Sequence, residues 1–306
     1  MFTLSGKKCV LLFLLGAVVF LSGGYLIGRY RQQALSPPPQ TEAIHLNRYY
    51  HFTELMRDPA IECELIRFNS DYDQSVQAMF VMRPVARKSE RLFFFFHGMD
   101  GDCGDGVVVR ELVKKLNATI ISLGGRGPVW VSDAFIADAE QVIRAGQKNF
   151  AGYYLMGISM GGTQALTLAG LLPEDLRASM LGVIALIPGS NLQAIAANSS
   201  SEDVRRTLLA CVGGNTLVLE RRSPIQLLDY YKPYLPFAIF YDQQDTILLT
   251  HELEEFIAAL RNKHHPVTTF TTSGNHSFSF SNFDYEEVVQ SLGSNSIENK
   301  VPLLSN

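Results

Sequence analysis

Short apolar segments alternate with amphipathic segments along most of the chain, and this alternation restricts the possible folds more than any other feature. Leu92–Phe96 (LFFFF) has no polar side chain, which is typical of a strand buried on both faces of a sheet. Ser132–Gln147 instead carries apolar residues at helical spacing, with Ser132 at a favourable N-cap position. Strands alternating with helices predict an α/β fold, a largely parallel sheet covered by helices on both faces.

The same criteria place one domain at residues 46–290, followed by a polar, flexible tail at 291–306. The predicted strands are Glu62–Phe68, Gln77–Val85, Leu92–Phe96, Ala118–Leu123, Tyr153–Met156, Leu181–Ile187, Phe237–Tyr241 and Val267–Thr271. The predicted helices are Val107–Leu116, Ser132–Gln147, Met160–Leu171 and His251–Arg261. Active sites of parallel sheets lie beyond the carboxyl ends of the strands, so reactive side chains are expected in the segments that follow them.

An uncharged run precedes this domain. After a short tail at residues 1–8, Cys9–Gly28 provides about 20 apolar or small residues, enough to span a bilayer as a helix. A cleaved signal peptide is the alternative, because Ser22-Gly23-Gly24 offers small residues for cleavage. The apolar run continues past these residues, which favours an uncleaved transmembrane signal-anchor. Residues 29–45 contain three consecutive prolines and are expected to form a stiff linker.

The segment after Tyr153–Met156 contains the pattern G-x-S-x-G, formed by Gly157, Ser159 and Gly161. The predicted strand precedes it and a predicted helix follows. A nucleophilic serine needs a very tight turn to project its oxygen away from the backbone, and flanking glycines remove side chains that would clash. We therefore predict Ser159 as a nucleophile, with the start of the next helix favouring negative charge nearby.

The segment after Leu92–Phe96 begins with His97-Gly98-Met99, and with the G-x-S-x-G turn it resembles the α/β-hydrolase superfamily of serine esterases, lipases and thioesterases. The resemblance covers about residues 60–290. It implies that Gly98 lets the chain bend and that the backbone N–H groups of Met99 and Met160 form the oxyanion hole. His97 is expected to hold this loop rather than to act as a base.

The resemblance also implies an acid after the strand Phe237–Tyr241, since the triad of this fold runs serine, acid, histidine. Family members usually carry G-x-x-D there, and Asp245 matches the aspartate. Asp242 occupies the place of the usual glycine and is the fallback acid. The acid must accept the far N–H of the imidazole and fix its tautomer.

The base is predicted as His276. It follows the last strand in a Gly274-Asn275-His276-Ser277 segment that resembles the family's histidine loop. His45 and His51 precede the predicted sheet, whereas His251, His264 and His265 are expected on the solvated surface of a helix.

Other features are less specific. Asp100, Asp102 and Asp105 lack the spacing of a calcium loop, so a solvated, flexible loop without metal is expected. Three of the four cysteines lie in the domain and match no metal or redox motif, leaving a disulfide or free thiols open. A net charge of −4 gives no reason to expect nucleic acid, and no cofactor is implied.

Between two predicted strands, residues 190–223, hereafter the cap, carry Leu192, Ile195, Val204, Leu208 and Leu209 at near-helical spacing. A small apolar cap and a membrane anchor favour an acyl ester or thioester of a small molecule or lipid, cleaved through an acyl-enzyme. An acyltransferase with the same triad and a catalytically inactive binding protein are the alternatives.

Location is inferred from two details. Lys7, Lys8 and the amino terminus carry slightly more positive charge before the apolar run than Arg29 and Arg31 carry after it. Because the more positive side of a membrane helix usually faces the cytoplasm, the domain is expected outside it. Asn275-His276-Ser277 is a glycosylation acceptor, and a glycan there would crowd the base. A single-pass protein of a bacterial inner membrane is therefore expected.

Overall fold

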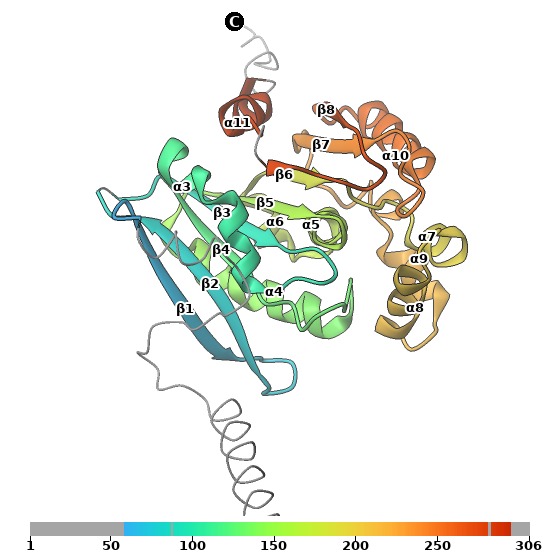
Figure 1. Ribbon diagram of the computed structural model, residues 1–306, viewed down its shortest axis with the longest axis horizontal. Helices are drawn as coiled ribbons and strands as arrows, with labels where there is room; N and C mark the ends of the chain where they lie inside the picture. Colours follow the sequence, from blue (N-terminus) through green and yellow to red (C-terminus); the bar gives the residue numbers. More distant parts are fainter. Residues whose placement is uncertain (1–57, 87, 281–282, 295–306) are drawn as a thin grey trace, which may run out of the picture. The chain divides into compact units, whose positions relative to one another are not determined.

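The computed structural model describes residues 58–86, 88–280 and 283–294. Its centre is an 8-stranded sheet with the order β1-β2-β4-β3-β5-β6-β7-β8 (Figure 1). The first two strands pair antiparallel and β2 pairs antiparallel with β4, whereas all strands from β4 to β8 pair parallel. The predicted α/β architecture is confirmed. The strands are β1 Ile61–Asn69, β2 Val76–Pro84, β3 Arg91–Phe96, β4 Ala118–Leu123, β5 Tyr153–Ile158, β6 Met180–Leu186, β7 Phe237–Asp242 and β8 Val267–Thr272.

Two layers of helices cover the sheet, and the side chains of β3 alternate between them. Phe94 and Phe96 enter the core under α4, α5 and α10, while Phe93 and Phe95 enter the core under η1, α3 and α11. The run LFFFF is thus buried on both faces, as its composition requires. The first layer comprises α4 Asp133–Gly146, α5 Met160–Leu171 and α10 Thr250–Asn262, with the short elements η2 Gln147–Asn149, α6 Glu174–Ala178 and η3 Pro224–Gln226. The second comprises η1 Cys103–Val109, α3 Glu111–Leu116 and α11 Tyr285–Ser294.

The cap forms three short helices between β6 and β7, grouped to the right of the sheet in Figure 1. They are α7 Leu192–Asn198, α8 Glu202–Cys211 and α9 Thr216–Arg222. Their buried side chains share one apolar cluster with Trp130, Met160 and Leu248. The two ends of the cap meet, because the Ile225 N–H donates to the Ser190 carbonyl at 3.1 Å and the Leu192 N–H donates to Ser223 Oγ at 2.8 Å.

Several local predictions are corrected. The helix expected at 107–116 is split into the 3₁₀ turn η1 and α3. The aspartate loop before it is ordered rather than solvated: Asp102 and Asp105 form a capping box at the start of η1, and Cys103 is buried. Residues 291–294 belong to α11 and not to a tail, because Leu292 packs into the core.

The structure also informs the cysteines and the membrane segment. Cys63, Cys103 and Cys211 are free thiols. The predicted membrane helix at 9–28 and the linker at 29–45 lie outside the described residues. Within the described ranges, no helix has both the length and the apolar character needed to cross a bilayer.

Candidate active site

Ser159 lies on the tight turn between β5 and α5, with a φ of 56° and a ψ of −118°. A Cβ added at Gly157 would lie 2.2 Å from the carbonyl oxygen of Gly161, and one added at Gly161 would lie 2.0 Å from the carbonyl oxygen of Phe96. Both contacts are impossibly short, so only glycine fits at either position. The Ser159 N–H donates to the Leu186 carbonyl at 2.8 Å, which ties the turn to the end of β6. The strained serine backbone is therefore held from several sides.

Three side chains from three strand ends meet at this turn. Ser159 Oγ lies 2.8 Å from His276 Nε2, and His276 Nδ1 lies 2.7 Å from Asp245 Oδ2. Ser159 follows β5, Asp245 follows β7 and His276 follows β8, so residues far apart in the sequence form one hydrogen-bonded chain. This is the geometry in which an imidazole can take a proton from a serine while a carboxylate fixes its tautomer.

Asp245 is a buried carboxylate with several partners. Its Oδ1 accepts the N–H groups of Ile247 at 2.8 Å and Leu248 at 2.9 Å, and its Oδ2 faces the imidazole. Burial alone would raise the pKa of Asp245, but the hydrogen bond and charge of His276, with the two backbone donors, hold the pKa of this carboxyl below its usual range. The carboxylate form required beside the imidazole is thereby favoured.

The loop after β3 passes directly beside the nucleophile. A Cβ added at Gly98 would lie 3.9 Å from Ser159 Cβ, so the backbone runs next to the serine with room to spare. Met160 is the first residue of α5, and its N–H therefore has no acceptor within the helix. These positions are compatible with the predicted oxyanion hole at Met99 and Met160, which stays a prediction.

His97 is buried and holds this loop. Its Nδ1 lies 2.6 Å from the Gly98 carbonyl oxygen, and its Nε2 lies 3.0 Å from the Gly124 carbonyl oxygen after β4. The side chain thus joins the ends of two neighbouring strands, as expected for a loop-holding role. Among the other histidines, His251 is exposed, whereas His265 is buried and contacts the Leu235 carbonyl, contrary to its predicted surface position.

Thr207 of α8 connects the cap to the site. Its hydroxyl accepts the indole N–H of Trp130 at 2.9 Å and lies 3.4 Å from the sulfur of Met99. Met99 also packs against the apolar cluster of the cap. The cap therefore forms an apolar wall beside the loop that borders Ser159.

Asp242 is the aspartate that the sequence offered as a fallback acid. It is 2% exposed, but its oxygens accept backbone N–H groups of Gln244 at 2.8 Å and Asn275 at 2.7 Å. The imidazole is held by Asp245 instead. The contact to Asn275 joins residues 33 positions apart and depends on loop geometry, so no local sequence signal could have revealed it.

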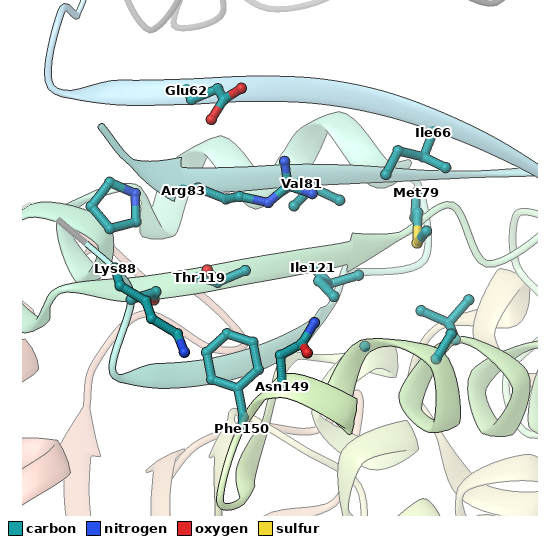
Figure 2. A pocket seen from close by; sticks show the side chains of 15 residues that line it. Glu62, Ile66, Met79, Val81, Arg83, Lys88, Thr119, Ile121, Asn149 and Phe150 are labelled. Atoms are coloured by element: carbon teal, nitrogen blue, oxygen red, sulfur yellow. The ribbon is translucent and has the colours of Figure 1, made fainter. Parts of the chain in front are cut away.

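A hollow of about 460 Å³ lies elsewhere, between β1, β2, β4 and the end of α4. Figure 2 shows Ile66, Met79, Val81 and Ile121 along its apolar wall, with Lys88 near Phe150 at its lower end. None of the candidate site residues lines it. In the described part of the chain no group of three or more histidine, cysteine or acidic side chains could hold a metal ion.

Comparison of the fold with solved structures finds many matches. An esterase from Pseudomonas putida is 16% identical with a TM-score of 0.57, covering 90% of this chain and 95% of that one. Esterase B from Lactobacillus rhamnosis is 14% identical with a TM-score of 0.56, covering 92% of both chains. Acylaminoacyl peptidase is 16% identical with a TM-score of 0.57, covering 84% of this chain but 44% of its own.

The chain has the α/β-hydrolase fold. This agrees with the resemblance inferred from the serine turn and the loop after β3. No family model matches the sequence, and no curated protein sequence matches it. At these identities the likeness establishes the fold, and the chain spans less than half of the acylaminoacyl peptidase it matches.

Proposed function

We propose that this protein is a serine hydrolase that cleaves an acyl ester or thioester through an acyl-enzyme. The observation that carries the proposal is the continuous contact from Ser159 Oγ through His276 to Asp245, with distances of 2.8 and 2.7 Å. In the first step His276 Nε2 accepts the hydroxyl proton while Ser159 Oγ attacks the carbonyl carbon of the substrate. The imidazolium then gives the proton to the leaving group as the acyl-enzyme forms.

Deacylation reuses the same groups. Water loses a proton to His276 and attacks the acyl carbon, and the carboxylic acid leaves as Ser159 regains its proton. Asp245 stabilises the imidazolium in both steps and stays ionised, in keeping with its lowered pKa. The N–H groups of Met99 and Met160 are proposed to bind the oxyanion of each tetrahedral intermediate.

The surroundings of Ser159 favour an apolar acyl group. Met99, Met160 and Trp130 belong to the apolar cluster that the cap completes with Leu192, Ile195 and Leu208. Most of these side chains are fully buried in the cluster, whereas Met99 is partly exposed in the loop beside Ser159. An acyl chain buried against an exposed apolar side chain gains about 0.8 kcal/mol per methylene. We infer a preference for acyl or lipid-like substrates over sugars, which would leave hydroxyl groups unpaired against this wall.

A fluorophosphonate probe and a chain-length series of model esters and thioesters test the proposal. We expect covalent labelling at Ser159, loss of labelling in Ser159→Ala, and hydrolysis that improves with acyl length. A folded wild-type protein that is neither labelled nor active on any member of the series would overturn the assignment and favour a binding role.

We further propose that residues 9–28 tether the domain to a bacterial inner membrane, with the domain outside the cytoplasm. The support is the uncharged run itself and the proline linker that follows. Cell fractionation and protease accessibility test the placement. Full-length protein that stays soluble after cell lysis contradicts the membrane tether. A domain that resists protease added to spheroplasts, under conditions in which a cytoplasmic control protein also stays intact, contradicts its placement outside the cytoplasm.

A further inference from the structure

The loop that carries His276 is held in an unfavourable backbone conformation. Gly274, Asn275 and His276 have φ values of 130°, 50° and 69°. Glycine tolerates this region, but Asn275 and His276 carry a Cβ that is crowded there. Non-glycine residues stay in such a conformation only when surrounding contacts hold them. Something outside the loop must therefore determine where the imidazole sits.

Asp242 provides such a contact to the backbone of the loop, beside the contact of Asp245 to the imidazole itself. It is the last residue of β7 and pairs in register with Thr272, the last residue of β8, so it lies where the two strands part. Its Oδ2 accepts the Asn275 N–H at 2.7 Å, and its Oδ1 accepts the Gln244 N–H at 2.8 Å. One buried carboxylate thus binds the loop of the base with one oxygen and the loop of the acid with the other.

The two oxygens suit this role because an ionised carboxylate only accepts hydrogen bonds, and both of its neighbours are N–H donors. A second link between the loops, from the Thr246 N–H to Asn275 Oδ1, is 3.3 Å long and exposed, and is therefore the weaker one. The Thr250 hydroxyl donates to the Asp242 carbonyl and so anchors the carboxylate's own backbone.

We propose that Asp242 is a positioning residue for His276, acting through the backbone of Asn275. Its carboxylate keeps the strained loop in place, so that Nε2 remains at hydrogen-bonding distance from Ser159 Oγ. The proposal rests on the proposed serine-hydrolase function. In the family that the chain resembles, glycine usually occupies this position, and a glycine has no side chain to make this contact.

Steady-state kinetics and hydrogen exchange of the Asn275 amide test the role in Asp242→Ala and Asp242→Asn. Loss of both acceptors in the alanine variant should lower kcat by roughly 10²-fold, as expected for a base displaced by about 1 Å. KM should change by less than about twofold, because substrate contacts remain. The Asn275 amide should exchange at least about tenfold faster. Asparagine keeps one acceptor oxygen and the same shape, so both effects should be intermediate.

Val113→Ala is the matched control for a general loss of stability. Val113 is buried in α3, which packs on β2 and β4 in the other half of the sheet. It should lower the melting temperature without changing kcat or Asn275 exchange. If Asp242→Ala behaves like this control, or if the asparagine variant matches wild type in both measurements, Asp242 has no positioning role. If Asp242→Ala does not fold, the comparison of Asp242→Asn with wild type decides the question. A wild-type protein without turnover sinks the proposed function, whereas the exchange measurement still reports on the loop.

Discussion

The strand ends around Ser159 and the hollow over β1, β2 and β4 differ most in backbone conformation. Of the eleven non-glycine residues with positive φ in the described part of the chain, seven lie in segments that follow a parallel strand. They are Arg126, Trp130, Ser159, Ile187, Leu249, Asn275 and His276. None of the residues that line the hollow has a positive φ.

This difference in backbone conformation distinguishes the candidate active site at the strand ends from the hollow over β1, β2 and β4. The hollow, at about 460 Å³, has the size of a small-molecule pocket, yet its backbone is relaxed and its Arg83 pairs with Glu64 on the neighbouring strand. At the strand ends, unfavourable conformations persist because backbone N–H groups and buried carboxylates hold them. Strain that is maintained by specific contacts indicates function better than volume does.

Ser159→Ala should produce the largest effect. Turnover is expected to fall on the order of a millionfold, as in other triads that lose their nucleophile. The alanine has the same Cβ as serine at a φ of 56°, so the melting temperature should stay near that of wild type. Steady-state kinetics and thermal unfolding check both statements. Unchanged turnover in a folded variant would mean that the strand ends around Ser159 are no more an active site than the hollow is.

Asp245→Asn should come next, at roughly 10⁴-fold in kcat, because an amide at this position stabilises the wrong imidazole tautomer. Asp242→Asn should have a far smaller effect, since its partners are backbone N–H groups. The same ester assay ranks the two variants. A reversed order would make Asp242 the acid and the contact at 2.7 Å to Asp245 incidental.

A matched pair of leucine substitutions compares the two regions directly. Gly98→Leu adds a side chain next to Ser159 Cβ and is expected to lower kcat/KM by roughly 10²-fold through displacement of the substrate. Ala145→Leu adds the same side chain to the hollow, on the exposed face of α4, and should leave kcat/KM within about twofold. A larger loss from Ala145→Leu would mean that the hollow takes part in the reaction.

The smallest expected effect is on how the free energy of unfolding depends on pH. The pKa of Asp245 lies below its usual range in the folded state, so ionised Asp245 contributes stability at neutral pH. That contribution is complete above the usual aspartate pKa and is lost as pH falls through the lowered folded value. Urea unfolding from pH 7 to pH 3 should therefore show a wild-type advantage over Asp245→Asn that shrinks with acidity. An advantage that grows with acidity would contradict the direction of the shift.

The sequence predicted what depends on local pattern. Every predicted strand is present. The central strands are recognisable because a buried strand needs an apolar run whatever its partners are. Ser159, Asp245 and His276 were predicted because each follows a strand, and the structure places their side chains within hydrogen-bonding distance of one another. The turn at Ser159 also needs glycine on both sides, which is visible in the sequence itself.

What the sequence did not predict depends on distant partners. Leu292 extends α11 because a core lies beneath it. The capping box of Asp102 and Asp105 is different, because its partners are only three residues apart and its spacing is visible in the sequence. His265 is buried because Leu235 supplies a carbonyl acceptor from 30 residues away. Asp242 was predicted as the fallback acid, but one of its oxygens accepts the N–H of Asn275, which is 33 residues away in the sequence. The contacts of Leu292, His265 and Asp242 follow no local spacing rule.

The meeting ends of the cap have a consequence for how such a protein can change. Because the backbones of Ser190 and Ile225 are hydrogen-bonded to each other, the two ends of the segment between them lie close together. A loop of different length can join two adjacent points at little entropic cost. The length of the cap can therefore change while β6 and β7 stay in register, provided that the new segment still covers Trp130, Met160 and Leu248. In the hydrolase proposed above, the segment beside the loop of Met99 is thus separate in the chain from the strand ends that carry Ser159, Asp245 and His276.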